Sequence, residues 1–465
     1  MSSTRILADF AAGLRFEDLP REVVEKLKLL TLNIIGKALA GAQTPLGPKY
    51  AGLATQMGGG GDQANAIYDG RRLSIPAATY VNSSFATALD YDDTLHWALI
   101  HPGNAGVSAG LAVGQALGSS GRDFLTSLVL AYEVGGRIAL STQPSPERFK
   151  QVWGLGNQAF CASSVAGKLL GFDSDHMLST LGITGVYSVV PSAWKYLGPG
   201  TRPMREVKMA WGWSAMVGVT SALAAREELR MLQPSNIFDG PESYFVLHGA
   251  DKQEPEKMVE GLGERWDVLT TAFKAYSACY LIFGACDAAK QAIGGRTIDP
   301  EAVQRVVVRG GEWITKRLSD PDPFGPVDAQ FSTQWCIAQM LQGVLPGPRW
   351  CDDAALKSEV SRKLARKVEL EFNPVADQMW LENGKSLNEV TIHLANGEVL
   401  HGAVDEPKGE PGNPFTDDEV RDTFRRLAGE VLDSSRVDAI VDAVDRLDTL
   451  EDVGELVRLT IVPQR

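Results

Sequence analysis

Apolar residues recur at intervals of three and four along most of the first 265 residues, which is the spacing of helices with one buried face. The clearest run begins after Pro20 and stops at Gly41, and proline suits the first turn of a helix just as glycine suits its end. The helices expected on this pattern are 20–41, 75–89, 105–117, 123–140, 160–170, 175–189 and 213–229. Many of their residues are Ala, Gly or Ser, which lets helices approach closely. The sequence therefore predicts a large all-α domain over residues 1–265.

The pattern changes near residue 266. Runs at 303–309, 368–372 and 390–394 are rich in β-branched residues or alternate apolar with polar positions, as strands do. Asn396-Gly397 predicts a hairpin turn after the last of these runs, with a return through 399–400. Helices are expected between the strands, at 328–343 and 354–366. These elements predict a smaller α+β lid domain over residues 266–405, in a protein that is mainly α.

A stretch rich in proline and glycine at 407–414 has the composition of a linker. Two further helices follow it, at 416–432 and 435–447. We expect this last segment, residues 406–465, to return to the large helical domain.

Composition and charge narrow the classes of partner. The net charge of −13 makes nucleic acid an unexpected partner. No run approaches the roughly 18 apolar residues of a membrane span, and no signal peptide is recognisable. The five cysteines are odd in number and form no CxxC pair, which favours free thiols in the cytoplasm and no metal site.

The densest cluster of chemical groups is Asp90-Tyr91-Asp92-Asp93-Thr94, which is followed by His96 and His101. Carboxylates at the end of an apolar helix are costly unless they are paired, exposed or functional. Asp92 and Asp93, taken alone, are expected to cap a helix or to remain solvated.

Several segments together resemble the MmgE/PrpD family, in the family's order and across nearly the whole chain. They are LDYDDT at 89–94 with the nearby His101-Pro102, AGKLLG at 166–171, Lys208 ahead of MAWG, KAYSAC at 274–279 and DAQFS at 328–332. Each segment is weakly specific, but the ordered set is strong evidence for the fold.

This resemblance implies a homodimeric, cofactor-independent enzyme with its site in the cleft between the two domains. Family substrates are small di- or tricarboxylates, so a small-molecule carboxylate is the implied partner. The implied catalytic residues are His101, Asp90, Lys208 and Lys274. The two lysines would hold carboxylates and His101 would move a proton, while Asp90 orients it. Thr94 and His96 are implied to contact the substrate.

The chain departs from the family's pattern where histidines are common. The stretch 151–158 has none, and Phe283 stands where many members have one. Trp335 replaces a tyrosine of the decarboxylase members. We therefore expect Trp153 and Trp335 to bind a substrate bulkier than methylcitrate.

Three functions stay open at this point. The first is a lyase, either a dehydratase or a decarboxylase, acting on a carboxylic acid. The second is an epimerase or isomerase of a substituted succinate, which would use the same α-proton chemistry. The third is a ligand-binding protein on the same fold that has lost catalysis, because a fold does not guarantee its function.

Overall fold

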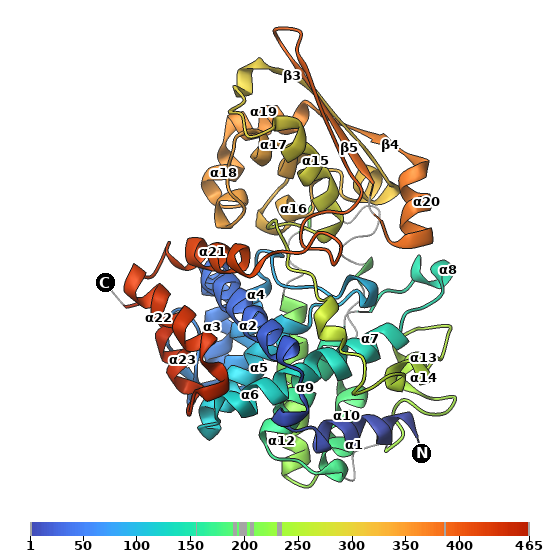
Figure 1. Ribbon diagram of the computed structural model, residues 1–465, viewed down its shortest axis with the longest axis vertical. Helices are drawn as coiled ribbons and strands as arrows, with labels where there is room; N and C mark the ends of the chain where they lie inside the picture. The colour runs from blue at the N-terminus through green and yellow to red at the C-terminus, as the bar shows by residue number, and fades with distance from the viewer. Residues whose placement is uncertain are drawn as a thin grey trace.

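The computed structural model of the protein describes residues 2–154, 156–188, 193–194, 202–204, 209–229, 235–385 and 387–463. Helices predominate, so the predicted mainly α class is confirmed. Figure 1 shows a broad helical body with a smaller part above it that contains a four-stranded sheet. We call these two regions the helical body and the α+β part. The domain boundaries expected at residues 265 and 405 stay predictions.

The helical body contains the helices that the periodicity predicts. Its main elements are α1 (Ser3–Gly13), α2 (Arg21–Ala42), α3 (Gly47–Gly58), α4 (Ile75–Thr87), α5 (Pro102–Leu117), α6 (Gly121–Leu130), α7 (Arg137–Ser141), α9 (Gln158–Leu169), α10 (Ser174–Tyr187) and α12 (Met209–Arg226). Helix α5 begins three residues earlier than expected, because Pro102 occupies its first turn, where a missing N–H costs nothing.

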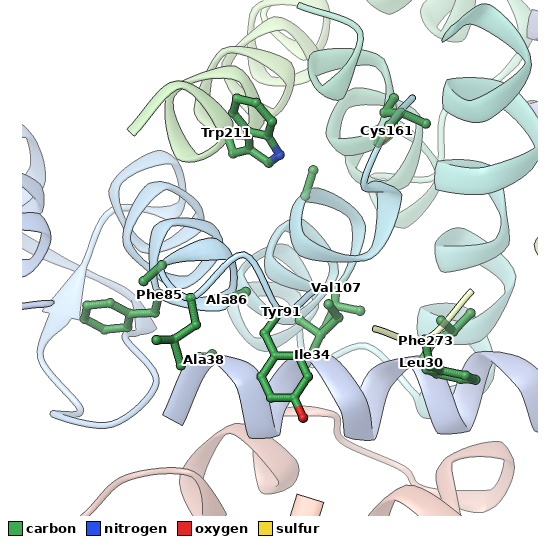
Figure 2. Packing of buried hydrophobic residues seen from close by; sticks show 14 of the residues in the cluster. Leu30, Ile34, Ala38, Phe85, Ala86, Tyr91, Val107, Cys161, Trp211 and Phe273 are labelled. Atoms are coloured by element: carbon green, nitrogen blue, oxygen red, sulfur yellow. The ribbon is translucent and has the colours of Figure 1, made fainter. Parts of the chain in front are cut away.

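Helix α2 is the central element of this body. It packs against α4 within the body and against α21 (Asp417–Ala428) from the C-terminal segment, so nearly all of it is buried. Leu30, Ile34 and Ala38 follow one another at intervals of four and lie along one side of α2 in Figure 2, with Tyr91 beside Ile34. Apolar residues on several faces of a helix are typical of a helix inside a core.

The helical stretch Gly121–Ser141 is long and apolar enough to cross a membrane, which the sequence analysis did not recognise. However, 94% of its most apolar window is buried inside the protein, as in a core helix. Its middle residues, Ala131–Gly136, form a π-turn between α6 and α7.

The helical body is not purely α, so this detail of the prediction was wrong. Strand β1 (Gly59–Asn65) pairs antiparallel with β2 (Arg72–Leu73) in a small ribbon. This ribbon was not predictable from the sequence, because the glycine-rich run in β1 lacks the alternation of apolar and polar residues that marks a half-buried strand.

The predicted strands of the α+β part are confirmed. They are β3 (Val303–Gly310), β4 (Val368–Phe372), β5 (Asn388–Leu394) and β6 (Val399–Val404), in the order β4-β3-β5-β6. Strand β3 is parallel to β4 and antiparallel to β5, and β5 and β6 form the expected hairpin. Gly397 in the turn has φ 86°, a left-handed conformation that glycine adopts without strain.

The helices of the α+β part are more divided than expected. The segment 328–343 forms two helices, α16 (Pro326–Gln330) and α17 (Thr333–Leu341). The division falls at Ser332, because its hydroxyl caps the second helix by accepting a bond from the backbone N–H of Trp335. The segment 354–366 likewise divides into α18 (Asp353–Lys357) and α19 (Glu359–Arg366) at Ser358. Helices α15 (Phe283–Ile293) and α20 (Pro374–Asn383) complete this part.

The C-terminal helices lie against the helical body in Figure 1. Helices α21 and α22 (Ser434–Asp445) contact α2, and α23 (Gly454–Leu459) contacts α5.

One buried ionic network joins the π-turn stretch to the loop that leads into the α+β part. The Arg137 side chain is fully buried, and its Nε lies 3.3 Å from Glu133 and 3.2 Å from Asp267. Its terminal nitrogens donate to the backbone carbonyls of Glu260 at 2.6 Å and Arg265 at 2.9 Å. Each of the three guanidinium nitrogens therefore faces an acceptor, as a buried charge requires.

We predict that Arg137→Met lowers the free energy of unfolding by about 3–5 kcal/mol, because it takes the buried cation away from Glu133 and from two backbone carbonyls. Asp267 keeps its ion pair with Arg265. Urea denaturation followed by tryptophan fluorescence measures the change. Arg305→Met on the exposed face of the sheet is the matched control and should change stability by less than about 1 kcal/mol. Equal effects of the two substitutions would contradict this account.

Candidate active site

A cavity of about 1090 Å³, including its opening to solvent, lies where the helical body meets the α+β part. Its polar residues are Asp90, Thr94, His96, His101, Lys274, Cys279 and Tyr280. Its other walls are aromatic or aliphatic and come from both parts, as Trp153 and Trp211 do on one side and Trp313, Phe331 and Trp380 on the other. A mostly apolar cavity with a few convergent polar groups is the usual form of a small-molecule site.

Asp90 and Lys274 form a buried ion pair in this cavity. The Lys274 Nζ donates to the Asp90 backbone oxygen at 2.9 Å and to its carboxylate Oδ1 at 3.1 Å, and lies 4.0 Å from Asp92. Burial by itself would lower the pKa of Lys274, but the carboxylates of Asp90 and Asp92 outweigh it and raise that pKa. Lys274 is therefore positively charged at neutral pH.

The backbone of Asp90 has a strained conformation. Helix α4 ends at Thr87, and Asp90 follows with φ 51°, in the left-handed region that few residues other than glycine adopt. Aspartate tolerates this region better than most residues, and such strain is concentrated at functional sites.

The acidic motif is tied to the segment that carries Lys274. Thr94 and Ala272 exchange backbone hydrogen bonds of 3.0 and 2.9 Å, and the Tyr91 hydroxyl donates to the backbone oxygen of Ala275 at 3.1 Å. Arg426 of α21 donates to the same hydroxyl at 3.4 Å, and Figure 2 shows this hydroxyl pointing away from the helical body. These bonds fix the position of Lys274 relative to Asp90.

Asp92 and Asp93 are fully buried, so the expectation that they remain solvated was wrong, whereas Asp93 does cap a helix, because it accepts from a backbone N–H in the first turn of α5. The Asp92 carboxylate accepts a bond of 2.5 Å from the Asn104 amide. The Asp93 carboxylate accepts bonds from the Tyr132 hydroxyl at 2.9 Å and the Gly103 N–H at 3.3 Å. Burial, and then the nearby Asp92 charge, raises the pKa of Asp93 to about 7. Both side chains brace the motif against α5.

His101 is held in one tautomer. Its Nδ1 lies 2.8 Å from the backbone oxygen of Asp93, and because a carbonyl only accepts, Nδ1 carries the proton. Nε2 of the neutral ring therefore keeps its lone pair. Burial, and then the positive charge of Lys274, lowers the pKa of His101, so the ring is neutral at pH 7. A neutral imidazole in a cavity can accept a proton from a bound molecule.

Gln158 and Trp211 support His101 from other helices. The Gln158 amide donates to the His101 backbone oxygen at 2.7 Å, and the rings of His101 and Trp211 lie 6.1 Å apart. Gln158 lies in the stretch 151–158 where a family histidine was missing, so this stretch contributes a positioning amide and the cavity-lining Trp153. Phe283, at the other such position, is buried against Tyr276 and Tyr280 and does not line the cavity.

Glu410 is a residue that the sequence analysis missed. It comes from the linker after the sheet, yet its Oε2 lies 3.2 Å from the Nδ1 of His96, a cavity residue. The His96 ring in turn stacks on Tyr280, with centroids 6.0 Å apart. Burial raises the pKa of Glu410 to about 7 and lowers that of His96. The two side chains therefore form a second group that can hold a proton near neutral pH, beside the cavity.

Most of the predicted site residues lie together. The residues that line the cavity are Asp90, Thr94, His96, His101, Trp153 and Lys274. Lys208 lies outside the described residues. Trp335 does not line the cavity, contrary to prediction. It is fully buried in α17, and its indole N–H donates to the Trp350 backbone oxygen at 2.7 Å. Over the described part of the chain, no group of three or more His, Cys, Asp or Glu is arranged to hold a metal ion.

Comparisons with known proteins agree with the resemblance seen in the motifs. Residues 5–256 match the model of the MmgE/PrpD N-terminal domain and residues 276–449 that of the MmgE/PrpD C-terminal domain. The chain is 27% identical to a cis-aconitate decarboxylase of Aspergillus terreus, over 99% of this chain and 96% of the relative. It is 24% identical to the human cis-aconitate decarboxylase, over 98% and 94% of the two chains.

We predict that Lys274→Met raises the pKa of His101, because it removes the nearby positive charge and frees Asp90 to stabilise the protonated ring. Titration of the histidine ring signals by NMR measures this, and the chain has only six histidines to assign. Lys357→Met, which alters an exposed lysine of α18 that does not line the cavity, is the control and should leave the His101 titration unchanged. An unshifted or lowered pKa of His101 in Lys274→Met would refute the electrostatic coupling.

We predict a distinct pH dependence of stability for Glu410→Gln. The pKa of Glu410 is about 7 in the folded protein and near the ordinary 4.5 when unfolded, so the folded state binds more protons between these pH values. Ionisation of Glu410 should thus cost wild-type protein about 2–3 kcal/mol of stability as the pH rises from 4.5 to 7. Glu410→Gln should gain on the wild type by this amount over that range in urea denaturation. The exposed Glu264→Gln is the control, and its stability should follow that of the wild type at every pH. If the stability of Glu410→Gln also ran parallel to that of the wild type across this pH range, the raised pKa of Glu410 would be refuted.

Proposed function

Because the chain belongs to the MmgE/PrpD family, we propose that it is a lyase that acts on a small carboxylic acid without a cofactor. The observation that carries this proposal is the neutral His101, held in one tautomer in the same cavity as the Lys274–Asp90 pair. A proton-transfer group beside a carboxylate-binding cation is what α-carbon chemistry on a carboxylic acid requires. The cis-aconitate decarboxylases among the relatives support a decarboxylase before a dehydratase.

In the proposed reaction, Lys274 attracts a carboxylate of the substrate and Thr94 donates a hydrogen bond to it. In a decarboxylation, the bond between the α-carbon and a second carboxylate breaks, CO₂ leaves and the electron pair stays on the carbon. The Nε2 of His101 takes up a proton from solvent, donates it to that carbon and returns to the neutral form seen in the structure. In a dehydration, neutral His101 would instead take the α-proton while hydroxide leaves the β-carbon. Lys208 is proposed as the second cation for the substrate.

A second candidate, epimerisation of a substituted succinate, is favoured by one observation. The His96–Glu410 pair places another proton-holding group at the same cavity as His101. Inversion at an α-carbon requires removal of a proton on one face and its return on the other, which two such groups can share.

We predict that His101→Gln lowers turnover by about 10²–10⁴-fold while the affinity for the substrate changes little, because glutamine keeps the polarity of the ring but cannot carry the proton. A proton NMR time course in deuterated buffer measures this with cis-aconitate, methylcitrate and substituted succinates. His401→Gln, on the exposed face of the hairpin, is the matched control.

The same time course separates the functions. Loss of CO₂ or water from one compound supports the lyase and identifies its substrate. Deuterium exchange at an α-carbon without elimination would contradict the lyase and support the epimerase. Binding without any reaction in wild-type protein would contradict both and leave the non-catalytic binding protein.

A further inference from the structure

Three aromatic residues that line the cavity, Phe149, Trp153 and Trp313, form one packed cluster with Trp194. The Trp153 ring lies 5.3 Å from Phe149 and 6.3 Å from Trp313, measured between centroids. Trp194 stacks on Trp313 at 5.6 Å with the ring planes 20° apart, and Arg317 lies 4.7 Å from the Trp194 ring. These rings come from segments far apart in the sequence, so the cluster forms only when the helical body and the α+β part meet.

Hydrogen bonds hold the cluster in place. The Trp194 indole N–H donates to the Phe149 backbone oxygen at 2.7 Å, and the Ala193 N–H donates to the Trp153 backbone oxygen at 2.8 Å. Rings fixed in this way present a preformed apolar surface to a bound molecule. The protein therefore loses little conformational entropy on binding.

The apolar surface continues beyond the main cavity. A smaller adjoining pocket shares Leu281, Trp313 and Trp380 with it and extends between Ile314 and Ala376 of the α+β part. Asp377 and Asn388 also line this pocket, so an extended substituent would meet mainly apolar groups until it reached these two polar side chains.

Positive charge is scarce among the described residues of the cavity. Among the described residues that line it, Lys274 is the only lysine or arginine, and Asp90 and Asp92 already share its charge. Even with Lys208 as the second cation proposed above, burying the three carboxylates of a tricarboxylate would leave at least one of them without a cation, which is costly because each desolvated charge needs a partner. A substrate with fewer carboxylates and a large apolar group matches this lining better.

We propose that the substrate is an aryl-substituted dicarboxylate, whose ring binds among Trp153, Trp313 and Trp380 while a carboxylate lies at Lys274. This inference rests on the proposed function, since it assigns a substrate class to the same site. The aromatic rings would contribute through the area that they remove from water and through edge-to-face contacts with the bound ring.

Isothermal titration calorimetry with phenylsuccinate, succinate and propane-1,2,3-tricarboxylate tests this. We expect phenylsuccinate to bind wild-type protein at least about tenfold more tightly than either of the other two, as burial of a ring predicts. Trp313→Leu and Trp380→Leu should each reduce this preference severalfold while succinate binding changes less than about twofold. Trp213→Leu, which alters an exposed tryptophan of α12, should preserve the preference.

Equal or tighter binding of the tricarboxylate, or an unchanged preference in both Trp313→Leu and Trp380→Leu, would overturn the proposal. Circular dichroism of each variant checks that it is folded. Binding is measured without turnover, so a failure of the lyase proposal stays distinguishable. Tight phenylsuccinate binding without any reaction would uphold this inference and reject the lyase, and turnover of cis-aconitate without an aryl preference would do the reverse.

Discussion

The buried ion pair between Lys274 and Asp90 is the interaction on which the site depends. Removing a lysine and an aspartate from water costs several kcal/mol for each ion, and direct contacts must offset this cost. Here the lysine gains the Asp90 carboxylate and backbone oxygen together, and Asp92 lies 4.0 Å away. The pair joins a helix end of the helical body to the segment that enters the α+β part, so the cavity exists only where these two regions are held in this register.

The same burial sets the charges of the other groups. The site contains several carboxylates and little solvent. Burial therefore drives Asp93 and Glu410 toward their neutral forms, as their raised pKa values show. His101 is driven the opposite way, toward its own neutral form, by burial and by Lys274. A buried ion pair surrounded by groups that titrate near neutrality is the arrangement that acid–base chemistry requires.

The sequence revealed the helices and most of the polar residues that line the cavity, for physical reasons that also explain what it did not reveal. Helical periodicity is local, so α2 and α4 were predictable, and the acidic motif concentrates Asp90, Thr94 and His101 within a few turns of chain. Glu410 was not predictable, because only tertiary packing brings the linker to His96. Trp335 looked like a cavity residue by its place in a motif, yet its indole N–H is turned inward to Trp350, and no spacing rule encodes that direction. Asp92 and Asp93 were misjudged because their partners, Asn104 and Tyr132, lie on later helices.

The aromatic walls of the cavity affect the chemistry of its acid–base groups. Tryptophan rings exclude water, and in their low-polarity surroundings the attraction between Lys274 and a substrate carboxylate is stronger than it would be in solution. The same surroundings weaken the protonated form of His101, which keeps a base available at neutral pH. A substrate with an apolar substituent would complete the exclusion of water on binding, whereas a highly charged one would bring water in with its charges. The substituent would in this way act on the chemistry as well as on the affinity, because it closes the cavity around the reacting carbon.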